Sequence, residues 1–595
     1  MTIMKRTHMC GSLRSENIGE EVSLNGWIAK RRNLGGLIFC DIRDKTGITQ
    51  VVFNDTIPTE LFERADRLRS EYVVGVRGKV VERESKNPDL PTGDIEIIAD
   101  DLVIYSEAET PPIYIKDDDN VDDNLRLKYR YLDLRKKKMQ DNLAFRAKLT
   151  NVTRDYFAEQ GFTEVETPML IKSTPEGARD YLVPSRVNQG RFYALPQSPQ
   201  TFKQLLMVGG TDRYVQIVKC FRDEDLRADR QPEFTQIDLE MSFVDVDDVI
   251  EVQEGFMKRV FKEMKGIDIE TPFPRMSWQE AMERYGSDKP DTRFGFELVD
   301  LTDLVKGCEF KVFNDAIEAG GSVRGICIDG GAAEYTRKKI DKLTEAVKSY
   351  GARGMVWIKV TEEGISSSVN KFFSPEELQA LADRFGAKAG DLILIISDKD
   401  RVVFDSLGFL RRHIAGELGL LDDEKINFLW VVDFPLFEYD EKEDRWSAMH
   451  HPFTSPKEED AELLKTDPHS CHANAYDIVL NGVELGGGSI RIHDRQMQED
   501  MFKALEMTQE EIDEKFGFLV EAFRYGTPPH GGLAYGLDRL IMLLTGEKSI
   551  REVIAFPKNQ AAQCMVSEAP GIVDPAQLEE LGLAITACNA EEDDE

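Results

Sequence analysis

A segment near residue 480 places two carboxylates and a run of glycines around the pattern of a β-hairpin. Asn481-Gly482 between apolar runs is the strongest short signal of a two-residue type I′ turn. In the register that this turn predicts, Val479 lies opposite Glu484, and Asp477 lies opposite Gly486. Asp477 and Glu484 then share one face of the hairpin as diagonal neighbours, roughly 7–8 Å apart.

The chemistry that this pair suggests is the binding of a hard cation. Mg²⁺ is often held by one or two carboxylates together with substrate phosphates, so Asp477 and Glu484 are candidate Mg²⁺ ligands. The glycines at positions 486–488 would let the backbone approach a ligand closely, although a bulge there would alter the register. The alternative is a solvated sheet face that carries two acidic side chains.

Three arginines lie in a polar loop between two strand-like runs: Arg222, Arg227 and Arg230. In the second run, Ile237, Leu239 and Met241 alternate with Asp238 and Glu240, which predicts a strand with one apolar and one acidic face. An arginine that leaves a strand beside acidic groups suits bidentate binding of phosphate. A salt-bridged surface hairpin is the alternative.

A third segment joins small residues to an apolar helix that ends at Gly546. Residues 526–536 are rich in glycine and proline, and Arg539 follows in the first turn of the predicted helix. A helix N-terminus favours anions through its free N–H groups and its dipole. A phosphate of ATP is therefore a fitting ligand for this place.

The elements that must position these residues are preceded by a β-rich region at residues 1–108. It has five strand-like runs, and a helical stretch at 59–68 separates the third from the fourth. The runs are Val22–Trp27, Leu37–Arg43, Ile48–Phe53, Tyr72–Val81 and Ile95–Tyr105. Five strands with one helix in this place predict an OB-fold, a small barrel that commonly binds single-stranded nucleic acid.

The rest of the chain predicts an α+β multidomain protein. Pro111-Pro112 and an acidic run mark a hinge, and a helix is expected from Asp141, as N-cap, to Gly161, with one buried stripe. An antiparallel-sheet catalytic domain is expected in two parts around an inserted α+β domain. The expected boundaries are 1–108 for the barrel, 109–140 for the hinge, 141–285 and 424–560 for the catalytic domain, 286–423 for the insertion, and 561–595 for a C-terminal extension with an acidic tail.

Composition limits the possible classes of protein. The 595 residues include 41% hydrophobic and 31% charged residues, which is typical of a globular chain. No apolar run approaches the roughly 20 residues that span a bilayer, and no signal peptide is predicted. None of the eight cysteines forms a Cys-x-x-Cys pair, which favours free thiols in a reducing, cytoplasmic setting. The net charge of −34 leaves two basic clusters, at 30–32 and 135–138, as candidate nucleic-acid contacts.

The three chemical segments resemble the signature motifs of class II aminoacyl-tRNA synthetases. Gly161–Pro168 resembles motif 1, the dimer-interface element, the Arg222 segment resembles motif 2, and the segment ending at Arg539 resembles motif 3. More narrowly, residues 174–185, 197–204 and 222–240 are similar to aspartyl-tRNA synthetases of the bacterial type. The resemblance covers essentially the whole chain.

The resemblance implies a role for each residue. Arg222, Arg539 and Glu484 would be catalytic, with Mg²⁺ on Asp477 and Glu484. The residues expected to bind L-aspartate are Glu176, Ser198, Gln200, Lys203, Arg222, Asp238, His450 and Arg491. The residues expected to bind ATP are Arg222, Asp223, Glu224, Gln231, Phe234, Glu484, Gly536, Leu537, Asp538 and Arg539.

Two of these roles carry the selectivity for aspartate. Lys203 and Arg491 would pair with the side-chain carboxylate of aspartate. A neutral asparagine would then leave both cations underpaired, at a cost of several (~3–5) kcal/mol. An asparaginyl- or lysyl-tRNA synthetase shares the architecture, but a lysine pocket needs acidic groups where these two cations stand. A tRNA-binding relative without catalysis is the remaining alternative.

The barrel would read the anticodon of tRNA-Asp. The residues implied in this contact are Arg32, Leu34, Phe39, Gln50, Asn87 and Glu96. Phe39 would stack on a base, or else belong to the barrel core. A relaxed form of the enzyme also charges tRNA-Asn and often carries histidine where this chain has Leu34, so leucine favours the strict form. The stripe of the motif 1 helix is expected to need a second copy, which predicts a homodimer.

Two further patterns are discarded or set aside. His413-Ile-Ala-Gly416 loosely resembles the HIGH signature of class I synthetases, but no KMSKS-like partner is present. His469, Cys471 and His472 offer three potential ligands in a polar loop, a weak candidate for a metal site.

Overall fold

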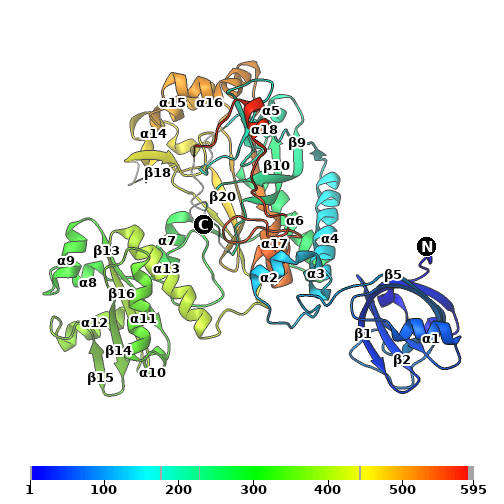
Figure 1. Cartoon of the computed structure of the whole chain (residues 1–595). Helices are drawn as coiled ribbons and strands as arrows, with labels where there is room; N and C mark the ends of the chain where they lie inside the picture. Colours follow the sequence, from blue (N-terminus) through cyan, green and yellow to red (C-terminus); the bar gives the residue numbers. More distant parts are fainter. Residues whose placement is uncertain (1–2, 174–176, 225, 227, 441–443, 587–595) are drawn as a thin grey trace.

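The computed structural model describes residues 3–173, 177–224, 226, 228–440 and 444–586. Figure 1 shows the N-terminal barrel and a five-stranded sheet as separate units below a large central sheet. Within the described residues, no helix combines the length and apolar character needed to cross a bilayer.

The N-terminal region is a closed five-stranded barrel in the order β1-β2-β3-β5-β4. Its elements are β1 (Glu21–Asn33), β2 (Ile38–Asp44), β3 (Gly47–Phe53), α1 (Thr59–Asp66), β4 (Val73–Glu82) and β5 (Ile95–Ser106). The expected OB-fold is confirmed, although β1 runs further than the sequence predicts. In β2 the fully buried Ile38, Cys40 and Ile42 alternate with partly exposed neighbours, as one-sided burial of a strand requires.

The central sheet has eight strands in the order β11-β17-β20-β21-β22-β10-β9-β6. It is antiparallel, as expected, except for the parallel pairs at its two edges, β11 with β17 and β6 with β9. The strands are β6 (Thr163–Glu164), β9 (Arg213–Phe221), β10 (Glu233–Ser242), β11 (Arg275–Ser277), β17 (Phe428–Val432), β20 (Ala475–Leu480), β21 (Val483–Ile490) and β22 (His530–Gly536).

Three helices and the apolar side of this sheet enclose the largest core: α4 (Lys137–Glu159), α6 (Val246–Lys265) and α17 (Leu537–Thr545). The prediction that α4 begins at Asp141 is wrong, because the helix starts at Lys137, one turn earlier. Leu149, Val152 and Tyr156 pack in the core of the same chain. The stripe is therefore buried without a second copy, which removes the argument that it needs one.

The second sheet, in the order β12-β13-β16-β14-β15, lies within the expected insertion. Helices cover both of its faces, and each face has its own apolar cluster. Its strands and longer helices are β12 (Val299–Asp300), α9 (Lys311–Glu318), β13 (Ser322–Ile328), α11 (Arg337–Lys348), β14 (Val356–Thr361), β15 (Gly364–Ser367), α12 (Pro375–Phe385), β16 (Leu392–Asp398) and α13 (Asp400–Glu417).

The expected hinge is more ordered than the sequence suggests. It holds α2 (Asp123–Lys128), α3 (Arg130–Asp133) and the first turn of α4. Arg130 is buried and donates hydrogen bonds to backbone carbonyls of residues 551, 554 and 555. Arg135 lies over the Trp27 ring of the barrel at 5.0 Å and donates to Glu71. The segment is thus attached to both the barrel and the region after α17.

Candidate active site

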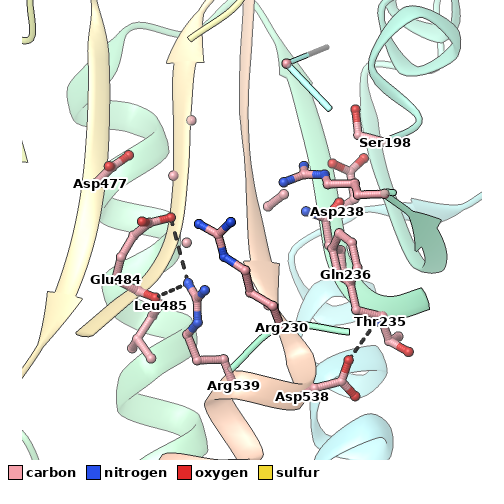
Figure 2. Close-up of a pocket in the computed structure, with 18 of the residues that line it drawn as sticks. Ser198, Arg230, Thr235, Gln236, Asp238, Asp477, Glu484, Leu485, Asp538 and Arg539 are labelled. Carbon is pink, nitrogen blue, oxygen red and sulfur yellow. Dashed lines mark hydrogen bonds and ion pairs between the residues drawn. The ribbon is translucent and has the colours of Figure 1, made fainter. Parts of the chain in front are cut away.

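A cavity of about 600 Å³ opens on the polar side of the central sheet. Its lining comes from β10, β21, the start of α17 and the loop between β9 and β10 (Figure 2). The lining includes most of the residues expected to act in the site: Ser198, Gln200, Lys203, Arg222, Glu224, Gln231, Phe234, Asp238, His450, Asp477, Glu484, Arg491, Gly536, Asp538 and Arg539. Glu176 lies outside the described residues.

The hairpin β20–β21 carries the carboxylate pair. Asn481 and Gly482 both have positive φ, 52° and 77°, as a type I′ turn requires, and Val479 pairs with Glu484 as predicted. The predicted pairing of Asp477 with Gly486 is wrong. A bulge between Ile478 and Val479 shifts the register, so Asp477 lies opposite Gly487. Figure 2 shows Asp477 and Glu484 on neighbouring strands at one end of the cavity.

The two carboxylates of Asp477 and Glu484 lie close enough to repel each other. Burial, reinforced by the nearby Glu484 carboxylate, raises the pKa of Asp477 well above its usual range. A Cβ on Gly487 would lie 2.2 Å from the Asp477 Oδ1 atom, so any larger residue there would displace the Asp477 carboxylate. Arg539 and Lys289 offset part of the charge of the pair, and two neighbouring carboxylates suit Mg²⁺. Asp477 is half-buried and the Glu484 side chain is 37% exposed, and both line the cavity rather than an open sheet face.

Beside the pair, the acidic face of β10 is buried rather than solvated. Asp238 and Glu240 have no exposed surface, and Lys203, from α5 (Gln200–Val208), lies between them. The Lys203 Nζ atom is 2.7 Å from an Asp238 oxygen and 3.2 Å from a Glu240 oxygen. A salt-bridged surface hairpin is thereby excluded.

Arg491 completes this charge network from the residue just after β21. Its Nε and Nη2 atoms donate to the two Glu240 oxygens at 2.8 and 3.1 Å, and its Nη1 atom donates to Ser489 and to the His451 Nε2 atom. Burial alone would raise the pKa of Glu240, but Arg491 and Lys203 hold it at about 2. Lys203 and Arg491 are therefore already paired with Asp238 and Glu240 before any substrate carboxylate is added.

Sequence reasoning gave no site role to Glu240 or His451. The alternation in β10 placed Glu240 on the same face as Asp238, and that shared face is the signal for its place in the site. His451 stands next to the predicted His450, which packs edge-on against Phe434. Burial and the Arg491 charge lower the pKa of His450 to about 4 and that of His451 well below its usual value. Both rings are therefore neutral in the site.

Arg222, just after β9, faces the centre of the cavity. Its guanidinium carbon lies 5.2 Å from the ring centroid of Phe234, one of the residues expected to bind ATP. The buried Nε atom of Arg222 has no hydrogen-bond partner among the described residues. A buried, unsatisfied guanidinium nitrogen is costly unless a ligand completes it. This residue is suited to bind an anion.

Arg539, in the first turn of α17, contacts the β20–β21 hairpin. It donates to the Glu484 carbonyl at 2.8 Å and pairs with Asp229 at 3.3 Å (Figure 2). Arg230 also reaches into the cavity and pairs with Glu224 at 2.7 Å. Arg539 and Arg230 thus each lie beside a carboxylate that would compete with a phosphate for the guanidinium group. Arg227 lies outside the described residues.

Several other predicted residues hold the site together. Asp538 accepts from Arg146 and from the Thr235 backbone, which fixes the start of α17 to β10. The Gln231 amide pairs with the backbone of Lys558 on both sides. Gln200 donates to Gln204, and Asp223 pairs loosely with Arg179. Leu537 packs in the core beneath the sheet.

On the barrel, one connected set of side chains matches the predicted anticodon contacts. Arg32 donates to Gln50 at 2.8 Å, and Gln50 donates to Glu96 at 2.7 Å. Phe39 is partly exposed, and its ring lies 5.7 Å from the Arg32 guanidinium. Phe39 is therefore outside the barrel core.

The other predicted barrel contacts lie in turns. Leu34, at the tip of the β1–β2 turn, is 67% exposed, and Asn87 accepts from the Asp89 backbone within the β4–β5 loop. The basic cluster at 135–138 is occupied by ion pairs within the chain. Its partners are Glu71, Asp119, Asp133, Asp141 and Glu547. This cluster is a poor candidate for binding nucleic acid.

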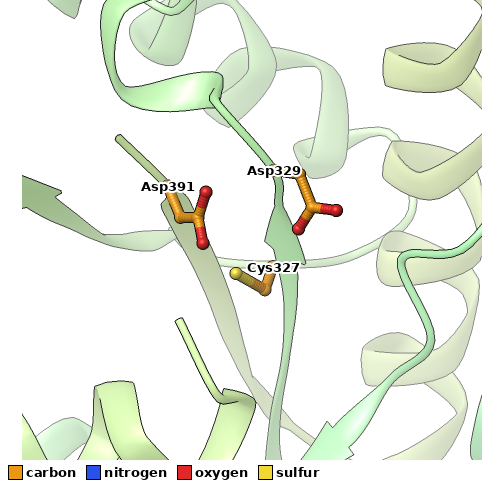
Figure 3. Close-up of side chains that lie close together, drawn as sticks. All are labelled: Cys327, Asp329 and Asp391. Carbon is orange, nitrogen blue, oxygen red and sulfur yellow. The ribbon is translucent and has the colours of Figure 1, made fainter. Parts of the chain in front are cut away.

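Two groups outside the cavity have metal-ligand residue types. His469 stacks on Trp446 and His472 pairs with Asp460, so the loop histidines are used in packing. Cys327, Asp329 and Asp391 lie close together in the second sheet unit (Figure 3). Both Asp391 oxygens accept backbone N–H groups, and burial with Asp391 raises the pKa of the Cys327 thiol to about 12. This group fixes loops.

Known proteins match both parts of the chain. A family model for class II tRNA synthetases (D, K and N) matches residues 122–560, and one for an OB-fold nucleic acid binding domain matches residues 22–105. The aspartate–tRNA ligase of Ruminiclostridium cellulolyticum is 59% identical over 98% of each chain. The aspartate–tRNA(Asp/Asn) ligase of Caldanaerobacter subterraneus is 57% identical over 98% of each chain.

The fold also has a counterpart among solved structures. The asparaginyl-tRNA synthetase of Pyrococcus horikoshii, in complex with asparaginyl-adenylate, superposes with a TM-score of 0.59 at 20% identity. The match covers 93% of this chain and 98% of that chain. At this identity the likeness concerns the fold alone.

Proposed function

This chain belongs to the class II tRNA synthetases of the D, K and N group, and we propose that it is an aspartate–tRNA ligase. It activates L-aspartate with ATP and transfers it to the 3′ end of tRNA-Asp, releasing AMP and pyrophosphate. The observation that carries this proposal is a single cavity that joins a pocket with two buried cations to Arg222 and a carboxylate pair.

We assign the pocket around Lys203 and Arg491 to the aspartate side chain. Arg491 has five N–H donors, and its contacts with described residues use four of them, so it can still bind one carboxylate oxygen. Asp238 and Gln200 face the same space and suit the substrate ammonium group. Lysine would bring a third cation beside Lys203 and Arg491, and the resulting repulsion disfavours a lysyl-tRNA synthetase.

The first step needs no protein base, because the α-carboxylate of aspartate is already ionised and attacks the α-phosphorus of ATP directly, with pyrophosphate as the leaving group. The chain's contribution is to hold the reactants in line and to stabilise anionic charge on the phosphate. Arg222 is placed for the α-phosphate, and Arg539 for the outer phosphates once it leaves Asp229. Mg²⁺ on Asp477 and Glu484 would supply charge neutralisation at the phosphates.

The intact catalytic set disfavours a tRNA-binding relative without catalysis. Such a relative would have no need for two neighbouring carboxylates in the cavity or for a buried Arg222 Nε atom without a hydrogen-bond partner among the described residues. Aminoacylation of purified tRNA-Asp with radiolabelled aspartate tests the function directly. We expect charging that depends on ATP, and its absence under saturating substrates would refute the proposal.

The barrel face around Phe39 is the proposed anticodon contact. Phe39→Ala is expected to raise the KM for tRNA-Asp by about tenfold, since stacking of a base on an aromatic ring contributes ~1–3 kcal/mol. Formation of the adenylate should not change, because the cavity lies on another sheet. Tyr114→Ala, at an exposed aromatic residue outside the barrel strands, is the control. Equal losses of both activities would assign Phe39 a structural role.

Leu34 bears on which tRNAs are charged. We expect the strict form, which charges tRNA-Asp only, because an exposed leucine offers no hydrogen bond to a second kind of base. A relative named for both tRNA-Asp and tRNA-Asn keeps the relaxed form as the alternative. Aminoacylation of the two transcripts decides between them. Comparable kcat/KM values would favour the relaxed form, and Leu34→His should raise charging of tRNA-Asn.

We also propose that the chain works as a homodimer in the cytoplasm. Phe243 is 74% exposed beside a hollow lined by Tyr156, Gln160 and Arg213, and aromatic side chains are enriched at protein–protein interfaces. Sedimentation at micromolar concentration should give twice the mass of one chain. Phe243→Asp should weaken association at least about tenfold, while Phe518→Asp should not. A fully active monomer would contradict the dimer.

A further inference from the structure

The turn that joins β20 to β21 is held from outside the central sheet. Arg412, on α13, donates from its Nη1 atom to the Gly482 carbonyl at 3.1 Å. Asn481 exchanges hydrogen bonds with Asn427 and donates to the Lys425 carbonyl at 2.7 Å. Both residues of the turn are therefore bound by the segment that leads from α13 back to the central sheet.

The segment that leads away from the central sheet meets the same turn. A Cβ on Gly482 would lie 2.7 Å from the Asp291 Cβ atom, so the two residues are in close contact. Asp291 is buried and pairs with Arg293, which also donates to the Asp422 carbonyl and to Asp423. The first and last segments of the 286–423 region thus both contact the Asn481-Gly482 turn of the β20–β21 hairpin.

Arg412 is itself presented by a rigid element. A Cβ on Gly408 would lie 2.3 Å from the Gly286 carbonyl oxygen, so α13 and the end of α7 (Trp278–Tyr285) pack backbone to backbone. The buried Arg411 guanidinium lies 4.7 Å from the Tyr285 ring and 4.3 Å from the Phe294 ring. The part of α13 that carries Arg411 and Arg412 is therefore packed tightly against the end of α7 and Phe294.

The sheet supports the Glu484 end of β21 from one side only. β21 pairs with β22 only from Gly486 to Ile490, so Val483 and Glu484 have a ladder partner on the β20 side alone. On the other side, the Arg539 side chain donates to the Glu484 carbonyl. Glu484 follows Gly482 by only two positions, so the turn is the nearest backbone support of the carboxylate on its N-terminal side.

We propose that Arg412 is a positioning residue for the Asp477–Glu484 pair, and that the 286–423 region takes part in the synthetase site by fixing the hairpin turn. The inference rests on the proposed function and goes beyond it, because it gives this region a role in binding MgATP. Aspartate binding should not depend on Arg412, since Arg491 is placed by pairing of β21 with β22 and by Glu240 of β10.

The test compares Arg412→Met with Arg401→Met, an exposed arginine nearer the start of the same helix. In Arg412→Met, the KM for MgATP in ATP–pyrophosphate exchange should rise about tenfold, as expected for loss of a charged hydrogen bond that fixes a ligand. The KM for aspartate should stay within about twofold of the wild type. Calorimetry should show the same loss of MgATP affinity without turnover, and Arg412→Lys should recover most of it.

Unchanged MgATP affinity in Arg412→Met would overturn the inference, as would equal losses for MgATP and aspartate. Arg412 is exposed, so Arg412→Met should fold. Its thermal unfolding midpoint is compared with that of Arg401→Met to confirm this. Exchange by the wild type with aspartate is measured first. Its absence would refute the proposed function, whereas MgATP binding by calorimetry would still decide the role of Arg412.

Discussion

Arg491→Leu is expected to lower kcat/KM for aspartate in ATP–pyrophosphate exchange by on the order of a thousandfold or more. The side chain is 3% exposed and makes the bidentate contact to Glu240, so no water can take its place. Binding of MgATP, measured by calorimetry, should remain within about threefold of the wild type because Arg222 and Arg539 lie on other elements.

The same substitution should also destabilise the fold. Without Arg491, the buried Glu240 keeps only Lys203 as a charged partner, and breaking a buried pair from one side costs about 3–5 kcal/mol. Arg491→Lys, which keeps the charge but loses the planar fork, should fall between the wild type and Arg491→Leu in both assays. Unchanged exchange with aspartate in a folded Arg491→Leu protein would remove this residue from the pocket.

Arg222→Ala is expected to lower kcat for adenylate formation by roughly a hundred- to a thousandfold, the effect of removing one preorganised group at a developing anion. The unpartnered Nε atom and the position over Phe234 leave the guanidinium available to a phosphate. The KM for aspartate should change far less than kcat. Arg495→Ala, at the exposed start of α15 (Arg495–Ala504), is the control, since Arg495 pairs with Glu499 outside the cavity.

Single-turnover kinetics distinguish this role from a structural one. A rate of adenylate formation that is slow even at saturating ATP and aspartate is the expected result for Arg222→Ala. If the rate returned to that of the wild type at high ATP, Arg222 would contribute only to binding.

Local patterns predicted much of this molecule because they depend on neighbours in sequence. Turn chemistry at Asn481-Gly482 placed Asp477 and Glu484 on one hairpin, and alternation in β10 gave its apolar face correctly. The bulge at Ile478/Val479 could not be placed from the sequence, since turn chemistry fixes the register only next to the turn. The start of α4 was missed because Lys136, its N-cap, is fixed by ion pairs to Asp119 and Asp133 rather than by a local capping residue.

Charged residues in the site were harder to predict than the strands that carry them. Alternation indicates that Asp238 and Glu240 share a face, but only packing of α5 and the 450–454 segment over β10 makes that face buried. Whether His450 or His451 contacts Arg491 is decided by the direction of one side chain in a loop. Sequence spacing carries no signal for that choice.

The central claim is that this site activates aspartate, and ATP–pyrophosphate exchange with aspartate, asparagine and lysine compared in parallel tests it most directly. The Arg491 and Lys203 cations predict rapid exchange with aspartate and, for asparagine and lysine, values of kcat/KM lower by at least about a hundredfold. Preferred exchange with asparagine or lysine, or no exchange with any of the three, would contradict the account.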